Sequence, residues 1–304
     1  MKAALFQRIG DNPNVVELPD PVVRAGDVLV DVMAAPVLPY AHEVFAGKRP
    51  MLFELPFVAG TGAIGRVSAM GSGTTELTIG DWVYCDPTLR ARDAQGLPAI
   101  SLQGLTAGDP SALPIQRDYR DGSWAEKLRL PLENVIPIGE IAAADAGRWL
   151  MLGTMLVPYG GLLSVQLAAG ETVVVNGATG SFGSAAVAVA LAMGAARVVA
   201  TGRNLGALKT LAERFGKRVR MAHMLGDQAA DTAAIQAAGG TPIDVVFDIL
   251  PPQANIDQVM TAIRAVRPGG RVSLMGGVGS GAQGGELNLP YTWLMRNNLT
   301  VKGQ

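Results

Sequence analysis

The sequence predicts an α/β protein in which a β-rich domain precedes a doubly wound parallel sheet. Short β-rich pieces separated by Gly and Pro fill the first part of the chain, residues 1–145. Apolar strands alternate with helix-length segments in the second part, residues 146–304. A hydrophobic content of 49% with 17% charged residues is typical of a folded chain, and 304 residues suffice for two domains.

The first domain is expected to be a compact, barrel-like arrangement of strands. Its strand candidates are DVLVDVMA, AIGRVSAMG, GDWVYCDP and WAEKLRL. Residues 86–121 carry Pro, Gly and Asp throughout, so they are expected to form a long excursion from this domain.

The second domain is expected to repeat strand and helix in turn. The strands are TVVVNGA, RVVATG, DVVFDIL and GRVSLMGG, and the helices cover about 181–193, 204–215 and 254–266. Strands at this spacing, apolar along their whole length, predict a parallel sheet covered on both faces.

A glycine-rich segment lies between the first of these strands and its helix. It fits the pattern A-x-G-x-x-G with Ala178, Thr179, Gly180, Ser181, Phe182 and Gly183. Small residues there let the backbone approach a pyrophosphate, and the helix N-terminus supplies N–H donors and positive potential. The strand before it and the helix and strand after it favour a dinucleotide site over a turn needed only for packing.

The end of the second strand indicates which dinucleotide binds. NAD-preferring sites place Asp or Glu there, whereas this chain has Gly202, Arg203 and Asn204. Arg203 can pair with a 2′-phosphate, which predicts NADP(H), although it could also be a solvated loop residue. Gly276 and Gly277 follow the last strand and are expected to approach the nicotinamide, unless they only make that loop mobile.

These features together resemble a known family across nearly the whole chain. A β-rich domain before the A-x-G-x-x-G unit, with GDWVYCDP and then DGSWAEKLRLPLENVIPI, is similar to the medium-chain dehydrogenase/reductases, the alcohol dehydrogenase and quinone reductase superfamily. The resemblance implies a GroES-like catalytic domain, a Rossmann domain and an active site in the cleft between them. It also implies a homodimer, because LNLPYTWLMRNNLTV lies where the family pairs edge strands. The family's C-terminal return to the catalytic domain is expected to be missing from this sequence.

The resemblance further implies that the catalytic zinc site is lost. Leu38 stands where zinc-dependent members have the first Cys ligand, Thr61 and Gly62 where they have a His-Glu pair, and Gly153 where they have the third ligand. None of the four can ligate zinc. Residues 86–121 match the lobe that holds a structural zinc in those enzymes, yet they contain no Cys.

No other residues are expected to rebuild a metal site. His42 and Glu43 are neighbours and diverge on either a strand or a helix. His223, the other histidine, is interpreted as structural.

Without zinc, hydride transfer to an activated acceptor is the favoured chemistry. A quinone or an α,β-unsaturated carbonyl places the developing charge on an oxygen that a hydrogen-bond donor can hold. Tyr40 falls at the proton-relay place of the zinc enzymes, so it is the candidate catalytic donor, with a cleft-lining role as the alternative. Tyr159, expected to begin a helix under the cofactor, is the weaker candidate. The alternatives are an alcohol or carbonyl dehydrogenase without zinc and a non-catalytic NADPH-binding protein.

Composition limits the partners to a small-molecule substrate. A net charge of -1 with scattered Lys and Arg predicts neither nucleic-acid nor membrane binding. The apolar run at residues 181–202 is too short in its helical part to cross a bilayer. A single cysteine, Cys85, and a start that does not read as a secretion signal predict a cytoplasmic protein.

Overall fold

The structure, a computed structural model, describes residues 1–240, 242–278 and 285–304. It divides into two compact units, Met1–Gly153 (unit 1) and Thr154–Gln304 (unit 2). The division falls within helix α4 (Met151–Ser164). It lies a little later in the chain than the boundary between residues 145 and 146 that the sequence predicted.

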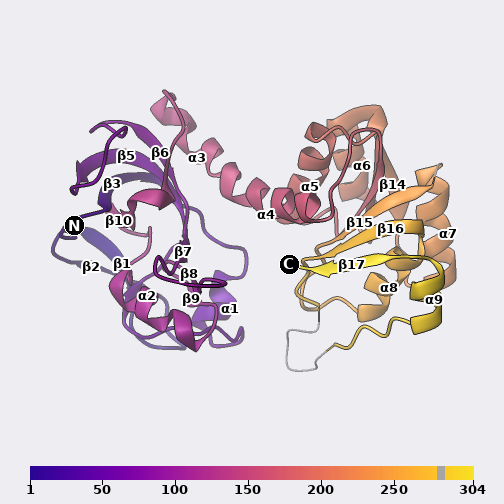
Figure 1. Ribbon diagram of the computed structural model, residues 1–304, viewed down its shortest axis with the longest axis horizontal. Coiled ribbons are helices and arrows are strands. Elements are labelled where there is room, and N and C mark those ends of the chain that lie inside the picture. Colours follow the sequence, from indigo (N-terminus) through magenta and orange to yellow (C-terminus); the bar gives the residue numbers. More distant parts are fainter. Residues whose placement is uncertain (241, 279–284) are drawn as a thin grey trace. The chain divides into compact units, whose positions relative to one another are not determined.

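Unit 1 is built around a five-stranded antiparallel sheet with the strand order β10-β3-β5-β6-β11 (Figure 1). The strands are β3 (Asp27–Ala34), β5 (Ala63–Met70), β6 (Trp82–Cys85), β10 (Lys127–Pro131) and β11 (Val135–Pro137). Val28, Val30, Val83 and Leu130 are fully buried in their shared core. The four strands predicted for this domain are therefore confirmed.

Smaller elements complete unit 1. A second sheet contains β1 (Lys2–Phe6), β2 (Asn14–Glu17) and β4 (Phe57–Val58). The 86–121 excursion has a sheet of its own, made of β7 (Thr88–Arg90), β8 (Ile100–Leu102) and β9 (Thr106–Ala107), and then helix α2 (Leu113–Asp118). Two further short helices are α1 (Ala41–Phe45) and α3 (Ala146–Trp149). Single 3-10 turns occupy Pro110–Ala112, Leu132–Asn134 and Ala143–Asp145.

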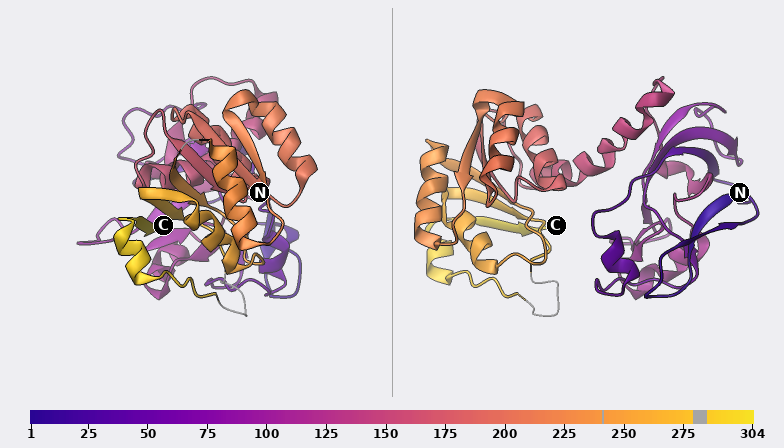
Figure 2. Two further views of the ribbon diagram at one scale, coloured as in Figure 1. Left: turned by 90° about the vertical axis from the view of Figure 1, so that its right-hand side faces the viewer. Right: turned by 180° about the vertical axis from the view of Figure 1, so that it is seen from behind.

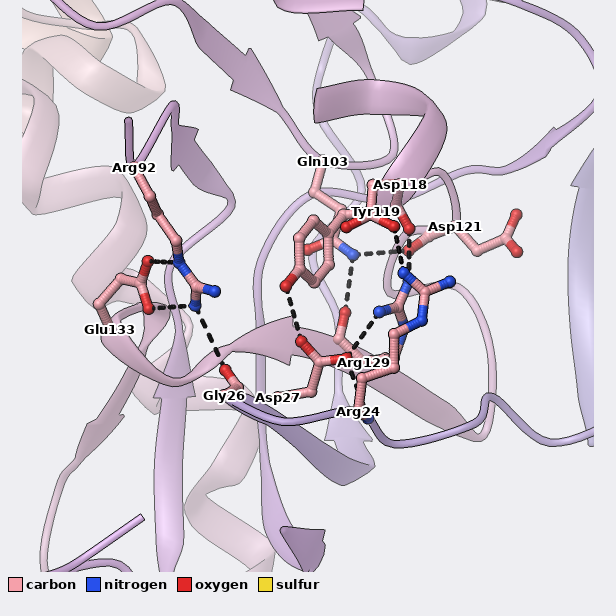
Figure 3. Close-up of polar contacts among 10 residues, drawn as sticks. All are labelled: Arg24, Gly26, Asp27, Arg92, Gln103, Asp118, Tyr119, Asp121, Arg129 and Glu133. Atoms are coloured by element: carbon pink, nitrogen blue, oxygen red, sulfur yellow. Dashed lines mark hydrogen bonds and ion pairs between the residues drawn. The ribbon is translucent and has the colours of Figure 1, made fainter. Parts of the chain in front are cut away.

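A polar network centred on Asp27 fastens the excursion to the main sheet (Figure 3). The buried Asp27 carboxylate accepts hydrogen bonds from the Tyr119 hydroxyl at 2.6 Å and from Arg129 Nη1 at 2.7 Å. Arg92, at the end of β7, forms a two-bond contact with Glu133 at 2.5 and 2.6 Å. Because Tyr119 and Arg92 belong to the excursion and their partners do not, these contacts attach the excursion to the main sheet.

Unit 2 contains one six-stranded parallel sheet with the order β14-β13-β12-β15-β16-β17 (Figure 1). Its strands are β12 (Thr172–Asn176), β13 (Arg197–Gly202), β14 (Val219–His223), β15 (Ile243–Asp248), β16 (Val266–Leu274) and β17 (Thr300–Gly303). The chain runs outward from β12 to β14 and then returns to β15 beside β12. This order is the doubly wound arrangement that the sequence predicted.

Helices cover both faces of this sheet (Figure 2). The helices α4, α5 (Ser181–Ala192) and α6 (Leu205–Phe215) pack on one face. The helices α7 (Gln228–Gly239), α8 (Ile256–Arg264) and α9 (Tyr291–Arg296) pack on the other. Val173 and Val175 face the first layer and Val174 the second, which explains why β12 is apolar throughout.

Helix α7 was not predicted from the sequence. It buries few side chains against the sheet, chiefly Ile235, and its segment QAADTAAIQAAG has only a weak apolar stripe. In the described part of the chain, no helix is both long and apolar enough to traverse a bilayer.

Candidate functional site

The glycine-rich segment forms the predicted turn between β12 and α5. Strand β12 ends at Asn176, and α5 begins at Ser181 with Gly180 as its N-terminal cap. No side chain of the described residues caps this helix end. Thr179, Gly180 and Ser181 are exposed, so the N–H groups of the first turn are available to a phosphate.

The two glycines that the pattern requires have different surroundings. A Cβ at Gly183 would lie 2.0 Å from the carbonyl oxygen of Gly177, so the turn cannot form with a larger residue there. A Cβ at Gly180 would meet only the same carbonyl oxygen, at 3.5 Å. Gly183 therefore serves the packing of the turn, whereas Gly180 keeps the exposed side of the turn small.

The end of β13 lies beside this turn. A Cβ at Gly202 would come within 3.0 Å of the Thr179 side chain, so Gly202 packs directly on the glycine-rich segment. Asn204 has a structural role, because its side-chain oxygen accepts a 3.0 Å hydrogen bond from Ala207 N and caps α6. Arg203 is exposed, and its guanidinium pairs with no described residue. Its carbonyl oxygen lies 2.9 Å from His223 Nε2, which gives that histidine the structural role expected of it.

A buried polar network that sequence reasoning missed joins the carboxyl ends of β13, β12 and β15. Thr201 Oγ1 donates to Asn176 Oδ1 at 2.8 Å, and Asn176 Nδ2 donates to Asp248 Oδ1 at 2.7 Å. The Gly177 N–H in turn donates to Thr201 Oγ1 at 3.3 Å. Burial raises the pKa of Asp248 to about 6, and hydrogen bonds from Asn176 and from the Leu250 backbone partly oppose that rise. A polar residue ending each of two apolar strands, TVVVN and DVVFD, was the available signal.

Gly276 and Gly277 follow β16 at the same edge of the sheet. A Cβ at Gly276 would lie 2.5 Å from Asp248 Oδ2, and the Gly277 N–H donates to the Leu250 carbonyl at 2.9 Å. The loop after β16 is thus packed against the buried carboxylate. Both glycine segments of unit 2 consequently contact one polar network.

In unit 1, Tyr40 begins helix α1 and is half-buried. The guanidinium of Arg49 lies over its ring, with the carbon Cζ 3.9 Å from the ring centroid. Burial raises the pKa of Tyr40 above its ordinary value, and the Arg49 charge opposes the rise. The phenol is therefore a neutral hydrogen-bond donor at pH 7.

Tyr159, the second candidate, is not placed as expected. It lies inside α4 rather than at the start of a helix, and its side chain is exposed. The helix begins earlier, at Met151, because the apolar segment MLGTMLVPYGGLLS continues through Pro158 without a break.

Comparisons with known proteins identify the family. Residues 24–140 match the model of the alcohol dehydrogenase GroES-like domain, and residues 182–304 match the model of the zinc-binding dehydrogenase domain. The chain belongs to the medium-chain dehydrogenase/reductase superfamily. Unit 1 is its GroES-like domain, and unit 2 is its nicotinamide-dinucleotide-binding Rossmann fold, as the sequence predicted.

Similar proteins of this superfamily carry out different oxidoreductions. Acryloyl-coenzyme A reductase of Metallosphaera sedula is 27% identical over 97% of this chain and 82% of its own length. L-threonine 3-dehydrogenase of Ruegeria pomeroyi is 26% identical over 95% of this chain and 80% of its own length. Among solved structures, a short chain alcohol dehydrogenase from E. coli CFT073 complexed with NADH has a TM-score of 0.78 at 19% identity, covering all of this chain and 83% of that one.

The residues of this medium-chain dehydrogenase/reductase do not fit the zinc of the matched domain model. Leu38 and Thr61, at two of the ligand positions, line a small hollow of about 20 Å³ together with Phe45 and Trp124. The Leu38 side chain has no atom that can bind zinc, and Gly62 has no side chain. Thr61 is not a usual zinc ligand. Among residues 1–240, 242–278 and 285–304, no three His, Cys, Asp or Glu side chains gather closely enough to hold a metal.

Gly153, at the remaining ligand position, and Cys85, the free cysteine, are both packed closely against other residues. A Cβ at Gly153 would come within 3.0 Å of the Tyr84 hydroxyl, so a longer ligand side chain has no room there in this packing. Cys85 is fully buried in the core of the main sheet, and burial raises its thiol pKa well above the ordinary value. The thiol is therefore inert rather than nucleophilic.

Proposed function

We propose that this protein is an NADPH-dependent, zinc-independent reductase that transfers hydride to a quinone or an α,β-unsaturated carbonyl. One observation carries the proposal. The segment that holds a zinc ligand in the zinc-dependent relatives places Leu38 on an apolar hollow and Tyr40, a neutral phenol, two residues later. This segment thus supplies a hydrogen-bond donor and no zinc ligand.

This combination suits a conjugated acceptor better than an alcohol. Alcohol oxidation needs a group that removes the hydroxyl proton and stabilises an alkoxide, which is the usual work of zinc. Hydride addition to a conjugated system instead spreads charge onto an oxygen, which one donor can stabilise. Bound NADPH would supply the hydride, and Tyr40 would donate its O–H to that oxygen.

Arg203 supports NADPH as the reductant. It stands at the end of β13, where NAD-specific sites carry an acidic residue, and no described residue neutralises its charge. Its guanidinium can make charge-assisted hydrogen bonds to a 2′-phosphate.

A second candidate is an alcohol or carbonyl dehydrogenase that works without zinc, which the similarity to L-threonine 3-dehydrogenase favours. The two candidates differ in the acceptor that they need. NADPH oxidation is therefore measured in the presence of a chelator against quinones, 2-alkenals, enoyl thioesters and saturated aldehydes.

Turnover of conjugated acceptors alone supports the reductase, and turnover of saturated aldehydes alone overturns it. Tyr40→Phe tests the catalytic role, with Tyr159→Phe as the control. We expect the first variant to lower kcat by about 100- to 1,000-fold, since the loss of one oxyanion donor costs about 3–4 kcal/mol, and the second to leave it unchanged. Tight NADPH binding without any turnover would indicate a non-catalytic binding protein.

We further propose that the protein is a homodimer joined at the β17 edge. Strand β17 ends the order of the unit 2 sheet and pairs only with β16 among the described strands, which leaves one side of it open. Tyr291 and Met295 of the preceding α9 are exposed at 79% and 57%. Light scattering after size exclusion is expected to give twice the chain mass of 31.6 kDa, and the mass of one chain would refute the dimer.

A further inference from the structure

Arg49 has an unusual combination of burial and partners. Its side chain is only 25% exposed, and its guanidinium lies over the Tyr40 ring at 3.9 Å. The nearest carboxylate oxygen, Glu43 Oε2, is 3.8 Å from Nη1, which is an ion pair but too long for a hydrogen bond. Within the described residues, the N–H groups of this guanidinium make no hydrogen bond.

This arrangement leaves the useful part of the guanidinium free. Stacking on an aromatic ring occupies the face of the guanidinium plane, whereas its N–H donors point outward along the edge. The guanidinium nitrogens of Arg49 are not among the buried polar atoms of the described residues that lack a partner, so they reach solvent and are open to an acceptor. A guanidinium held in place by its face, with its edge unengaged, is a binding group for an oxygen anion.

We propose that Arg49 and Tyr40 form a two-donor site for the substrate oxygen that becomes negative during reduction. The inference rests on the proposed function, because it names a second residue for that same site. The phenol O–H is fixed to the ring on which Arg49 stacks, so both donors belong to one rigid pair. Glu43 forms an ion pair with the guanidinium at 3.8 Å without accepting a hydrogen bond from it.

The pair would act during hydride addition to the conjugated acceptor. A new C–H bond forms at the β-carbon of the acceptor from the incoming hydride, and the C=C electron pair moves to give an enolate oxygen. Arg49 stabilises this oxygen by charge and Tyr40 by its O–H. A proton from water then adds to the α-carbon and completes the saturated carbonyl, and NADPH, when bound, would supply the two electrons of the hydride.

The charged groups around Tyr40 make the pairing measurable without any substrate. Arg49 lies over the ring, Glu43 forms an ion pair with Arg49, and the neighbouring His42 of α1 is exposed. Since the Arg49 charge lowers the pKa of Tyr40 against the effect of burial, removal of that charge must raise it. The phenolate absorbance of wild type minus that of Tyr40→Phe isolates this group from the other tyrosines.

The test compares Arg49→Gln and Arg49→Lys with Lys48→Gln as the control, because Lys48 is an exposed neighbouring cation outside the pair. Arg49→Gln is expected to raise the Tyr40 pKa and to lower kcat on a conjugated acceptor at least tenfold, with KM changed less than threefold. Arg49→Lys keeps the positive charge but loses the planar guanidinium that stacks on the ring. It is therefore expected to keep the Tyr40 pKa and to have a kcat between those of the wild type and Arg49→Gln. Lys48→Gln, which removes a positive charge outside the pair, is expected to retain the wild-type kcat and Tyr40 pKa.

Each result has a defined meaning. Wild-type kcat in both Arg49 variants would overturn the proposal, and if Arg49→Gln does not fold, the kcat of Arg49→Lys decides. Absence of turnover in the wild type would overturn the proposed function instead. In that case the titration still tests the pair, because an unchanged Tyr40 pKa in Arg49→Gln would show that the two groups do not interact.

Discussion

The side-chain amide of Asn176 donates a 2.7 Å hydrogen bond to the carboxylate of Asp248, and this contact joins β12 to β15. The two strands are neighbours at the point where the strand order reverses, with β13 on one side and β16 on the other. Ligands of doubly wound sheets bind beside this point. The contact therefore links the end of β12, which leads into the glycine-rich turn, to a buried carboxylate.

Asp248 makes the free energy of unfolding depend on pH. Its pKa is raised from 3.8 to about 6 in the folded protein, so the folded state binds the proton more tightly than the unfolded state. The resulting stabilisation is complete below roughly pH 4 and is lost as the pH rises through about 6, and it amounts to about 3 kcal/mol.

Chemical denaturation of the wild type and of Asp248→Asn between about pH 4 and pH 8 checks this dependence. The difference between the two stabilities should change by about 3 kcal/mol across that range, because other titrating groups cancel. A difference that stays constant with pH would show that Asp248 has an ordinary pKa.

Arg203 should control the choice between the two dinucleotides. Arg203→Ala is expected to weaken NADPH binding by about 10- to 100-fold, the loss of one charge-assisted contact, and to leave NADH binding unchanged. Arg214→Ala, at an exposed arginine in the last turn of α6, serves as the control. Fluorescence titration measures both affinities, and tighter binding of NADH than of NADPH to the wild type would contradict the assignment.

The glycine-rich turn should tolerate a methyl group at one glycine but not at the other. Gly183→Ala places a Cβ 2.0 Å from the Gly177 carbonyl, so the turn must distort, at a cost of about 3 kcal/mol. Gly180→Ala meets nothing closer than 3.5 Å and should change the unfolding free energy by less than about 1 kcal/mol. Equal losses of stability, measured by denaturant unfolding, would refute this difference.

The Asp27 network should contribute far more to stability than an exposed ion pair of the same sheet. Asp27→Asn leaves the buried guanidinium of Arg129 without its carboxylate and is expected to cost about 3–5 kcal/mol. Asp31→Asn removes the partly exposed pair with Lys127 and should cost less than about 1 kcal/mol. Denaturant unfolding of both variants provides the comparison, and equal costs would mean that Asp27 is not the centre of the network.

The sequence predicted those parts of the molecule that depend on periodicity and local motifs. The four strands expected in each unit and the turn from Ala178 to Gly183 lie where they were expected, because apolar strands and small residues at a strand-helix junction leave clear local patterns. The sheet within residues 86–121 and helix α7 were missed, since β7, β8 and β9 are only two or three residues long and the Ala-rich sequence of α7 has only a weak apolar stripe.

In the candidate site, too, the sequence indicated residues in local motifs but not the contacts between distant residues. Arg203 and Tyr40 could be named from their positions in motifs, but the stacking of Arg49 on Tyr40 and the link from Asn176 to Asp248 could not. Asn176 and Asp248 are 72 positions apart in the chain, and only the pairing of β12 with β15 brings them together. The cap formed by Asn204 is a local contact that the dinucleotide interpretation overlooked.

The most direct test of the central claim follows a deuterium label from NADPH deuterated at the transferring position of C4 to the product. The protein is first depleted of metal with a chelator and then incubated with a 2-alkenal, and the product is examined by NMR. A reductase of conjugated acceptors gives a saturated aldehyde with one deuterium at the β-carbon. Two results would contradict the proposed reaction. One is an allylic alcohol with deuterium at the carbon that bears the hydroxyl, and the other is turnover that returns only when zinc is added.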